Sequence, residues 1–163
     1  MTTGCEPIAV SRTIDAPAEV IFSYLADPAH HPEIDGSGML RAGDPSHMLS
    51  GVGDAFDMKM CNDEMGDYEI TNHVVEFEQV RKIVWEPVLK SASRAEDQAA
   101  VGDRAGHRWG FELTPLGADA TTVTEIFDCS QAPEWLQKVL DGGNRWVQSM
   151  TITLEKLDAT IAH

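Results

Sequence analysis

The sequence is short of cysteine, of basic residues and of long apolar runs, and each shortage removes a class of function. Its three cysteines, Cys5, Cys61 and Cys129, are odd in number, far apart and without a CxxC pair, which indicates reduced thiols rather than a disulfide framework. Lys and Arg number 12 against 27 Asp and Glu, so the formal net charge is −15. Because that charge repels phosphate groups and anionic headgroups, we expect no nucleic-acid partner and no acidic membrane surface.

No segment has the features of a membrane anchor or a secretory leader. Apolar runs fall well short of the roughly 20 residues that a membrane-spanning helix needs. The opening MTTGCEPIAV has neither a basic start nor an apolar core. We therefore expect a cytoplasmic protein. The length of 163 residues and the hydrophobic content of 42% fit a single globular domain, residues 1–163.

Common motifs of cofactor and nucleophile chemistry are also missing. Residues 51–54, GVGD, lack the spacing of a dinucleotide-binding or phosphate-binding loop, and no GxSxG occurs. Nothing in the sequence places a base beside Cys61 or Cys129, which favours small buried thiols over nucleophiles. The HHPEID segment, residues 30–35, supplies metal-ligating residue types, but adjacent histidines between two prolines do not converge easily. We expect neither a metal nor a cofactor.

Hydrophobic periodicity predicts an α+β order of elements. Residues 8–14 alternate as a strand, with Arg12 on the apolar side, and Pro17 suits the first turn of a following helix. The middle of the chain is mostly β. The C-terminal segment is helical, with a break at Gly142-Gly143 before a single apolar stripe. That stripe consists of Trp146, Met150, Leu154, Leu157 and Ile161.

Residues 108–114 and 121–128 form a hairpin whose register the sequence defines well. If the turn centres on Ala118, apolar side chains face one another and Arg108 pairs with Asp128. The predicted pairs on the apolar face are Trp109 with Phe127, Phe111 with Glu125, and Leu113 with Val123. Glu125 is therefore predicted to point where the aromatic side chains point.

The hairpin that precedes it, residues 68–88, is less well defined. Centring its turn on Val80 places Val75 opposite Trp85, and it puts His73 on the same apolar face. Because the other face is apolar too, a slip of one residue would exchange every side chain. His73 is therefore predicted inward only in this register.

Several stretches resemble the helix-grip (SRPBCC) superfamily, which includes START lipid-binding domains, relatives of plant pollen allergens and bacterial polyketide cyclases/dehydratases. These stretches are TIDAPAEVIFSYLADPAHHPEIDG, VVEFEQVRKIVW, RWGFELTPLG…TTVTEIFD and TLEKLDA, and they cover nearly the whole chain in order. The resemblance implies a curved antiparallel β-sheet wrapped around a long C-terminal helix, with two short helices after the first strand. It also implies that HHPEID is a structural corner. The polar stretch 89–106 departs from the family pattern, and we expect a loop or a lid there.

A curved sheet that grips one helix leaves room for a cavity between them. Aromatic rings and adaptable thioethers on the apolar faces suit a planar or lipid-like ligand, although such residues also pack ordinary cores. The predicted cavity residues are Arg12, Phe56, Met58, Met60, Trp85, Trp109, Phe111, Phe127, Trp146 and Met150.

Three polar residues, Arg12, His73 and Glu125, are predicted to lie among apolar side chains, where each needs a partner. In one interpretation, Arg12 and Glu125 neutralise each other as a structural ion pair. In another, His73 or Glu125 acts as an acid or base on an enolisable carbonyl, with its pKa shifted by the apolar wall. In a third, Arg12 binds a carboxylate-bearing ligand.

These observations lead to three hypotheses. In the first, the protein binds or carries a hydrophobic small molecule, such as a lipid, polyketide or aromatic metabolite. In the second, it is a polyketide cyclase, aromatase or dehydratase in which His73 and Glu125 move protons. In the third, it is a protein-interaction module with an acidic surface. The sequence is compatible with a monomer or a homodimer.

Overall fold

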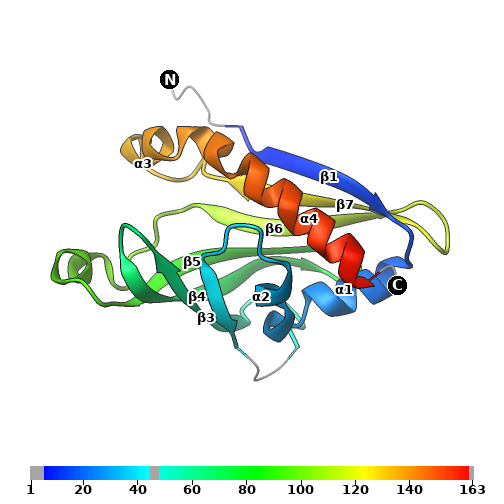
Figure 1. Ribbon diagram of the computed structural model, residues 1–163, viewed down its shortest axis with the longest axis horizontal. Coiled ribbons are helices and arrows are strands. Elements are labelled where there is room, and N and C mark those ends of the chain that lie inside the picture. Colours follow the sequence, from blue (N-terminus) through cyan, green and yellow to red (C-terminus); the bar gives the residue numbers. More distant parts are fainter. Residues whose placement is uncertain (1–5, 45–47, 162–163) are drawn as a thin grey trace.

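The computed structural model, which describes residues 6–44 and 48–161, is an α+β fold built on one antiparallel sheet. Its strands are β1 (Ile8–Ile14), β2 (Leu40–Gly43), β3 (Ala55–Asn62), β4 (Gly66–Glu78), β5 (Lys82–Ala92), β6 (Arg108–Pro115) and β7 (Thr121–Asp128). The seven strands are hydrogen-bonded in the order β1-β7-β6-β5-β4-β3-β2, and the sheet curls around one helix (Figure 1). The predicted helix-grip architecture is confirmed.

The helices divide between the two ends of the sheet. They are α1 (Ala18–Leu25), η1 (Pro28–His30), α2 (His31–Ile34), η2 (Ala95–Ala100), α3 (Glu134–Val139), η3 (Asp141–Trp146) and α4 (Val147–Ile161). Helix α4 crosses the concave face, α1 and α2 lie at its C-terminal end, and α3 lies at the opposite end (Figure 1). None of the helices in the described part of the chain is long and apolar enough to cross a bilayer.

A compact hydrophobic core fills the end of the curved sheet next to α1. Ile21, Phe22 and Leu25 of α1 and Leu154 and Leu157 of α4 are all at most 2% exposed. Burying side chains of this size contributes about 1.5–3 kcal/mol each relative to leaving them exposed. The first half of α4 does not meet this core, since Met150 belongs to a second cluster with Phe127, Cys129 and Ala132.

The β6–β7 hairpin has the predicted register. Trp109 lies opposite Phe127, Phe111 opposite Glu125, and Arg108 opposite Asp128. Strand β1 pairs with the other edge of β7, so β7 is an interior strand of the sheet. The residues of β7 alternate between buried and half-buried, as a strand with one face on the core requires.

The β4–β5 hairpin differs from the prediction because β4 contains a bulge. Phe77 lies opposite Ile83, but Val74 rather than Val75 lies opposite Trp85, since the register shifts between Val74 and Glu76. A bulge adds one residue to a strand, so side chains on its two sides are out of phase with a simple alternation. The predicted pairing of Val75 with Trp85 was therefore wrong.

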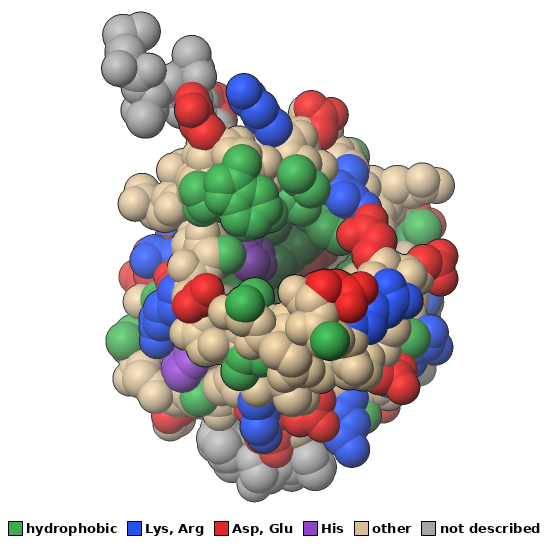
Figure 2. Space-filling view, turned by 90° about the vertical axis from the view of Figure 1, so that its left-hand side faces the viewer, with side chains coloured by type: hydrophobic (Ala, Val, Ile, Leu, Met, Phe, Trp, Pro, Cys, Tyr) green, Lys and Arg blue, Asp and Glu red, His purple; other side chains and the backbone are tan. Residues whose placement is uncertain are grey.

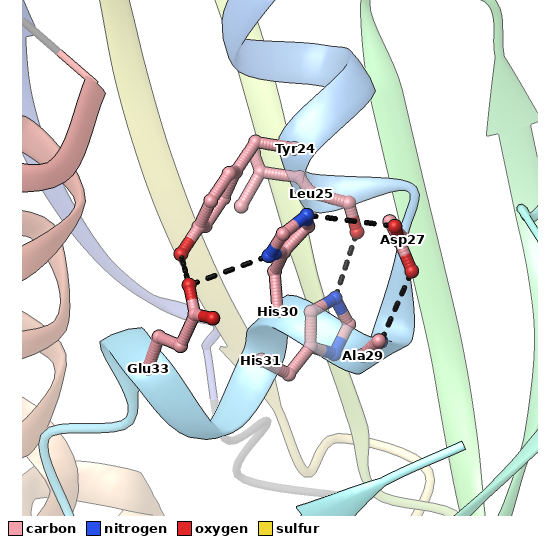
Figure 3. A network of polar contacts seen from close by, with 7 residues as sticks. All are labelled: Tyr24, Leu25, Asp27, Ala29, His30, His31 and Glu33. Carbon is pink, nitrogen blue, oxygen red and sulfur yellow. Dashed lines mark hydrogen bonds and ion pairs between the residues drawn. The ribbon is translucent and has the colours of Figure 1, made fainter. Parts of the chain in front are cut away.

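The HHPEID segment forms the expected structural corner (Figure 3). His30 stacks on the ring of Tyr24 and lies 3.3 Å from a carboxylate oxygen of Glu33, which also accepts a hydrogen bond from the Tyr24 hydroxyl. That hydrogen bond holds the pKa of Glu33 below its usual range. His31 makes a different contact: its Nε2 lies 2.7 Å from the carbonyl oxygen of Leu25. Within the described ranges, no group of three or more His, Cys, Asp and Glu side chains is placed to hold a metal ion.

The predicted break before the C-terminal helix is confirmed. Gly142 and Gly143 have φ values of 62° and 98°, a left-handed conformation that glycine adopts without a Cβ penalty. The two residues separate α3 from α4 and turn α3 towards the open end of the sheet (Figure 1). Cys129 is buried and Cys61 is half-buried, and neither forms a disulfide bond, while Cys5 lies outside the described residues.

Candidate functional site

A cavity of about 930 Å³ lies between the concave face of the sheet and the first half of α4. Its mouth opens at the end of the sheet opposite α1, where Figure 2 shows a hollow bordered by apolar and acidic side chains. The β3–β4 turn, the segment that follows η2 and the apolar side of α3 surround this mouth. The volume falls in the range of pockets that enclose drug-sized ligands.

The cavity wall is mainly aromatic rings and thioethers. Eight of the ten residues predicted for a cavity line it: Met58, Met60, Trp85, Trp109, Phe111, Phe127, Trp146 and Met150. The Trp109 ring is 4.5 Å from Phe127 and 5.9 Å from Trp146, centroid to centroid. Such broad faces and flexible thioethers adapt to a flat or elongated apolar ligand.

Two residues of the predicted set do not line the cavity. Phe56 is 1% exposed and packs behind the wall, with its ring 5.5 Å from the rings of His31 and Trp85. Arg12 is exposed at the edge of β1, where its Nε lies 2.7 Å from a carboxylate oxygen of Asp158 in α4. The interpretation in which Arg12 neutralises Glu125 was therefore wrong. Arg12 lies on the face of β1 that meets α4, as predicted, but β1 is an edge strand, so Arg12 is exposed there and pairs with Asp158 of α4.

His73 does not face the cavity either. It lies opposite Ala55 and Glu86, on the face of β4 that points away from α4. The bulge at Val75 causes this, since it shifts the alternation of every residue that precedes it in β4. The residue that enters the cavity in its place is Asn72, which is fully buried.

Among the described residues, four polar side chains along the cavity have no hydrogen-bond partner. They are Asn72, through both its amide nitrogen and its oxygen, Glu125 through Oε1, His107 through Nδ1 and Trp146 through Nε1. A buried polar group without a partner costs about 1–3 kcal/mol, and folded proteins contain few of them. These groups are concentrated along one cavity, where a bound molecule could hydrogen-bond with them.

Glu125 is the most perturbed of these groups. Its side chain extends from β7 towards the cavity, directly across from Phe111, and it is 7% exposed. Burial in this apolar wall, followed by the negative charge of Asp35, raises the pKa of Glu125 to about 8. The carboxyl group is therefore mainly protonated at neutral pH, able both to donate a hydrogen bond and to release a proton.

Two histidines line the cavity as neutral side chains. His31 stacks on Trp85 at 5.5 Å, and burial lowers its pKa. Burial also lowers the pKa of His107, which contacts Phe127 across a ring distance of 6.1 Å. Neither imidazole ring therefore carries a positive charge at neutral pH.

The segment predicted as a loop or lid is more ordered than expected. Strand β5 continues to Ala92, and η2 then leads to residues that lie against the cavity mouth. Glu86, 7% exposed, binds Arg108 at 3.3 Å and Arg104 at 3.6 Å, and so ties this segment to the sheet. Across the mouth, Trp135 of α3 is 66% exposed.

The sequence pattern did not identify Asn72, His31 or His107 as cavity residues. Asn72 was hidden by the bulge, which leaves no mark in a simple alternation of polar and apolar residues. His31 was interpreted as part of a corner, which it is, but the corner faces the cavity. His107 directly precedes β6, the strand that carries Trp109. No pattern in the sequence shows that its side chain lines the cavity.

No family model matches the chain. Two curated relatives do match, both from Mycobacterium tuberculosis: the uncharacterized protein Rv0088 of strain H37Rv, 33% identical over 124 residues, and the uncharacterized protein MT0096 of strain CDC 1551, 32% identical over 124 residues. Each match covers 75% of this chain and 48% of the relative. The chain thus spans about half the length of the curated relatives it matches.

Solved structures share the fold over nearly the whole chain. Protein Ms6760 from Mycobacterium smegmatis has a TM-score of 0.65 at 17% identity, covering 94% of this chain and 89% of its own. The AHSA1 protein from Silicibacter pomeroyi has a TM-score of 0.64 at 15% identity, covering 96% and 98%. DynU16, a protein from the dynemicin biosynthetic locus, has a TM-score of 0.56 at 18% identity, covering 96% of this chain and 48% of DynU16. The chain has the helix-grip SRPBCC fold, as the resemblance implied.

Proposed function

We propose that this protein binds a hydrophobic small molecule in the cavity between the sheet and α4. The observation that carries the proposal is the set of unpartnered polar groups, Asn72 and Glu125 above all, set into an aromatic wall. The wall would supply affinity at about 25 cal/mol per Å² of apolar surface removed from water. The polar groups would orient the ligand, because a ligand that leaves them unpaired gains less.

The cavity volume supports this function over the interaction-module hypothesis, which expects an interior filled by side chains. A lipid, a polyketide or an aromatic metabolite would fit about 930 Å³. The occurrence of a similar fold in a protein of a biosynthetic locus is in keeping with a small-molecule ligand.

The test is a search for a bound molecule in the purified protein. Native mass spectrometry should show an adduct that is released on denaturation and identified by its exact mass. Met60→Trp should reduce the adduct, since Met60 lines the cavity, whereas Lys59→Trp, on the exposed face of the same strand, should not. An equal loss in both variants, or no adduct under any expression condition together with no binding of apolar probes, would contradict the proposal.

A second function, acid–base catalysis on an enolisable carbonyl, is favoured by one observation. Glu125 is a buried, unpartnered carboxyl group with a pKa of about 8, close to the value at which an acid or base works best at neutral pH. His73 drops out of this hypothesis because it lies outside the cavity. If the protein is a cyclase, aromatase or dehydratase, Glu125→Gln should abolish turnover and leave substrate affinity within about threefold.

A further inference from the structure

The cavity carries an excess of negative charge. Five acidic residues of the described chain line it: Asp35, Asp63, Glu64, Asp103 and Glu125. All five are part of the formal net charge of −15; Asp63, Glu64 and Asp103 are exposed, Asp35 is half-buried and Glu125 is buried. A concave site with apolar walls focuses the field of such charges, so cations accumulate in it and anions are repelled.

The basic residues of the lining do not balance this charge at the buried part of the cavity. Arg104 and Arg145 belong to the mouth, where both are exposed. Arg104 is held 3.6 Å from Glu86, and the guanidinium of Arg145 lies over the Trp146 ring at 4.9 Å. The lining histidines, His31 and His107, have lowered pKa values and are neutral. In the described chain, no lysine lines the cavity.

Within residues 6–44 and 48–161, Glu125 is thus a buried acid without a counter-ion. Its Oε1 has no hydrogen-bond partner, Phe111 lies directly across from it, and Asp35 adds further negative charge nearby. Asn72, which is also unpartnered, contributes an amide oxygen as a second acceptor on the same concave face. The aromatic rings that line the cavity beside Glu125, Phe111 among them, attract an ammonium group through their quadrupoles.

We propose that the ligand of this cavity is a hydrophobic amine, bound with its basic nitrogen at the Glu125 carboxyl group. This inference rests on the proposed function and names its ligand class. The apolar body of the amine lies along the tryptophan and phenylalanine rings and points to the mouth. An ammonium group forms an ion pair with the Glu125 carboxylate, and the proton that the carboxyl group held in the free protein goes to the solvent.

Anionic and neutral ligands fit this site less well. A carboxylate placed beside Glu125 would face two acids without a cation to offset the repulsion. An alcohol would form a hydrogen bond with Glu125 but no ion pair, and it would gain nothing from the negative charge of Asp35. The amine therefore gains an interaction that neither analogue has, and this difference of affinities is what selects it.

Three probes with one apolar body test the inference: 9-(aminomethyl)anthracene, 9-anthracenemethanol and anthracene-9-carboxylate. Dissociation constants are measured by fluorescence titration at neutral pH on the wild type, on Glu125→Gln and on Glu112→Gln. The last variant makes the same substitution at an exposed position on β6 and controls for the overall field. Thermal unfolding establishes that each variant is folded.

The amine should bind the wild type about tenfold or more tightly than either analogue, and Glu125→Gln should remove most of that advantage. Glu112→Gln should change all three affinities by less than about twofold. Calorimetry on the wild type supplies a readout that needs no variant. The enthalpy of amine binding should be more exothermic in Tris than in phosphate, because the buffer takes up the released proton.

The inference is overturned if the alcohol or the carboxylate binds as tightly as the amine, or if amine binding releases no proton. In either case the cavity still binds apolar molecules, and the proposed function survives. If none of the three probes binds, both the inference and the proposed function lose their support.

Discussion

Phe127 on β7 packs directly against the backbone of Gly143, at the kink between α3 and α4. A Cβ atom at position 143 would lie 2.5 Å from Cδ2 of Phe127, closer than any side chain tolerates. The same ring lines the cavity and packs on Trp109. This contact therefore packs the kink between α3 and α4 against a residue of the cavity wall.

We expect Gly143→Ala to destabilise the protein by about 2–4 kcal/mol. A left-handed φ of 98° costs an alanine about 1 kcal/mol, and the overlap with Phe127 adds about 1–3 kcal/mol. Urea unfolding measures the loss. The matched control is Gly117→Ala, with a φ of 101° and no atom near its Cβ position, which should cost only the conformational part. Equal losses at both positions would show that the Phe127 contact is unimportant.

The stability contribution of Glu125 should fall as the pH rises. An unfolded glutamate loses its proton near pH 4.5, whereas folded Glu125 keeps its proton until about pH 8. Between these values the unfolded state binds fewer protons than the folded state, so the free energy of unfolding decreases with pH and levels off above pH 8. The full change is on the order of 5 kcal/mol.

Glu125→Gln removes this dependence. Its free energy of unfolding relative to the wild type should therefore rise between pH 5 and pH 8, as measured by urea denaturation at several pH values. Glu112→Gln, at an exposed position, is the control. A difference between Glu125→Gln and the wild type that does not vary with pH would show that Glu125 is ionised in the folded protein.

Asn72 and His73 provide a test of the bulge in β4. Asn72→Leu replaces a buried, unpartnered amide with an apolar group of similar size, and we expect it to stabilise the free protein by about 1–3 kcal/mol. His73→Leu, on the other face, should change the free energy of unfolding by less than about 0.5 kcal/mol. A larger change in the free energy of unfolding for His73→Leu than for Asn72→Leu would show that His73, and not Asn72, lies on the concave face.

The ion pair between Arg12 and Asp158 should contribute little to stability. The Arg12 side chain is 44% exposed, and exposed pairs of this kind contribute about 0.2–1 kcal/mol. A double-mutant cycle with Arg12→Ala and Asp158→Ala measures the coupling, which should weaken in 1 M salt. A cycle between Arg12 and Glu125 should give no coupling. Coupling there would contradict the separation of these two residues.

The two hairpins show when a sequence specifies a register. In β6 and β7, hydrophobic matching and the Arg108–Asp128 pair favour the same alignment, and that alignment is observed. In β4 and β5, both faces carry apolar residues, so the sequence contains no penalty against a shift. The bulge at Val75 decides which face is buried, and a strict alternation of apolar and polar residues cannot represent a bulge.

Predictions of the site residues were correct where the register of the hairpin was well specified and wrong where it was not. Glu125 was predicted to face the aromatic residues because a well-specified hairpin carries it, and it does. His73 was misplaced because its hairpin is poorly specified. Arg12 was misplaced for another reason, since alternation gives the face of a residue but not how far an edge strand leaves it open to solvent.

The sequence by itself determined the order of the elements, the apolar stripe of α4, the glycine break and the aromatic wall, because all of these depend on local periodicity and backbone preference. Only the tertiary structure decided which polar groups enter the cavity and which find partners. That decision depends on one inserted residue in β4, on the carboxylate that α4 brings to Arg12, and on the absence of any basic group beside Glu125 in the described chain. Such contacts join residues far apart in the sequence, and no local pattern encodes them.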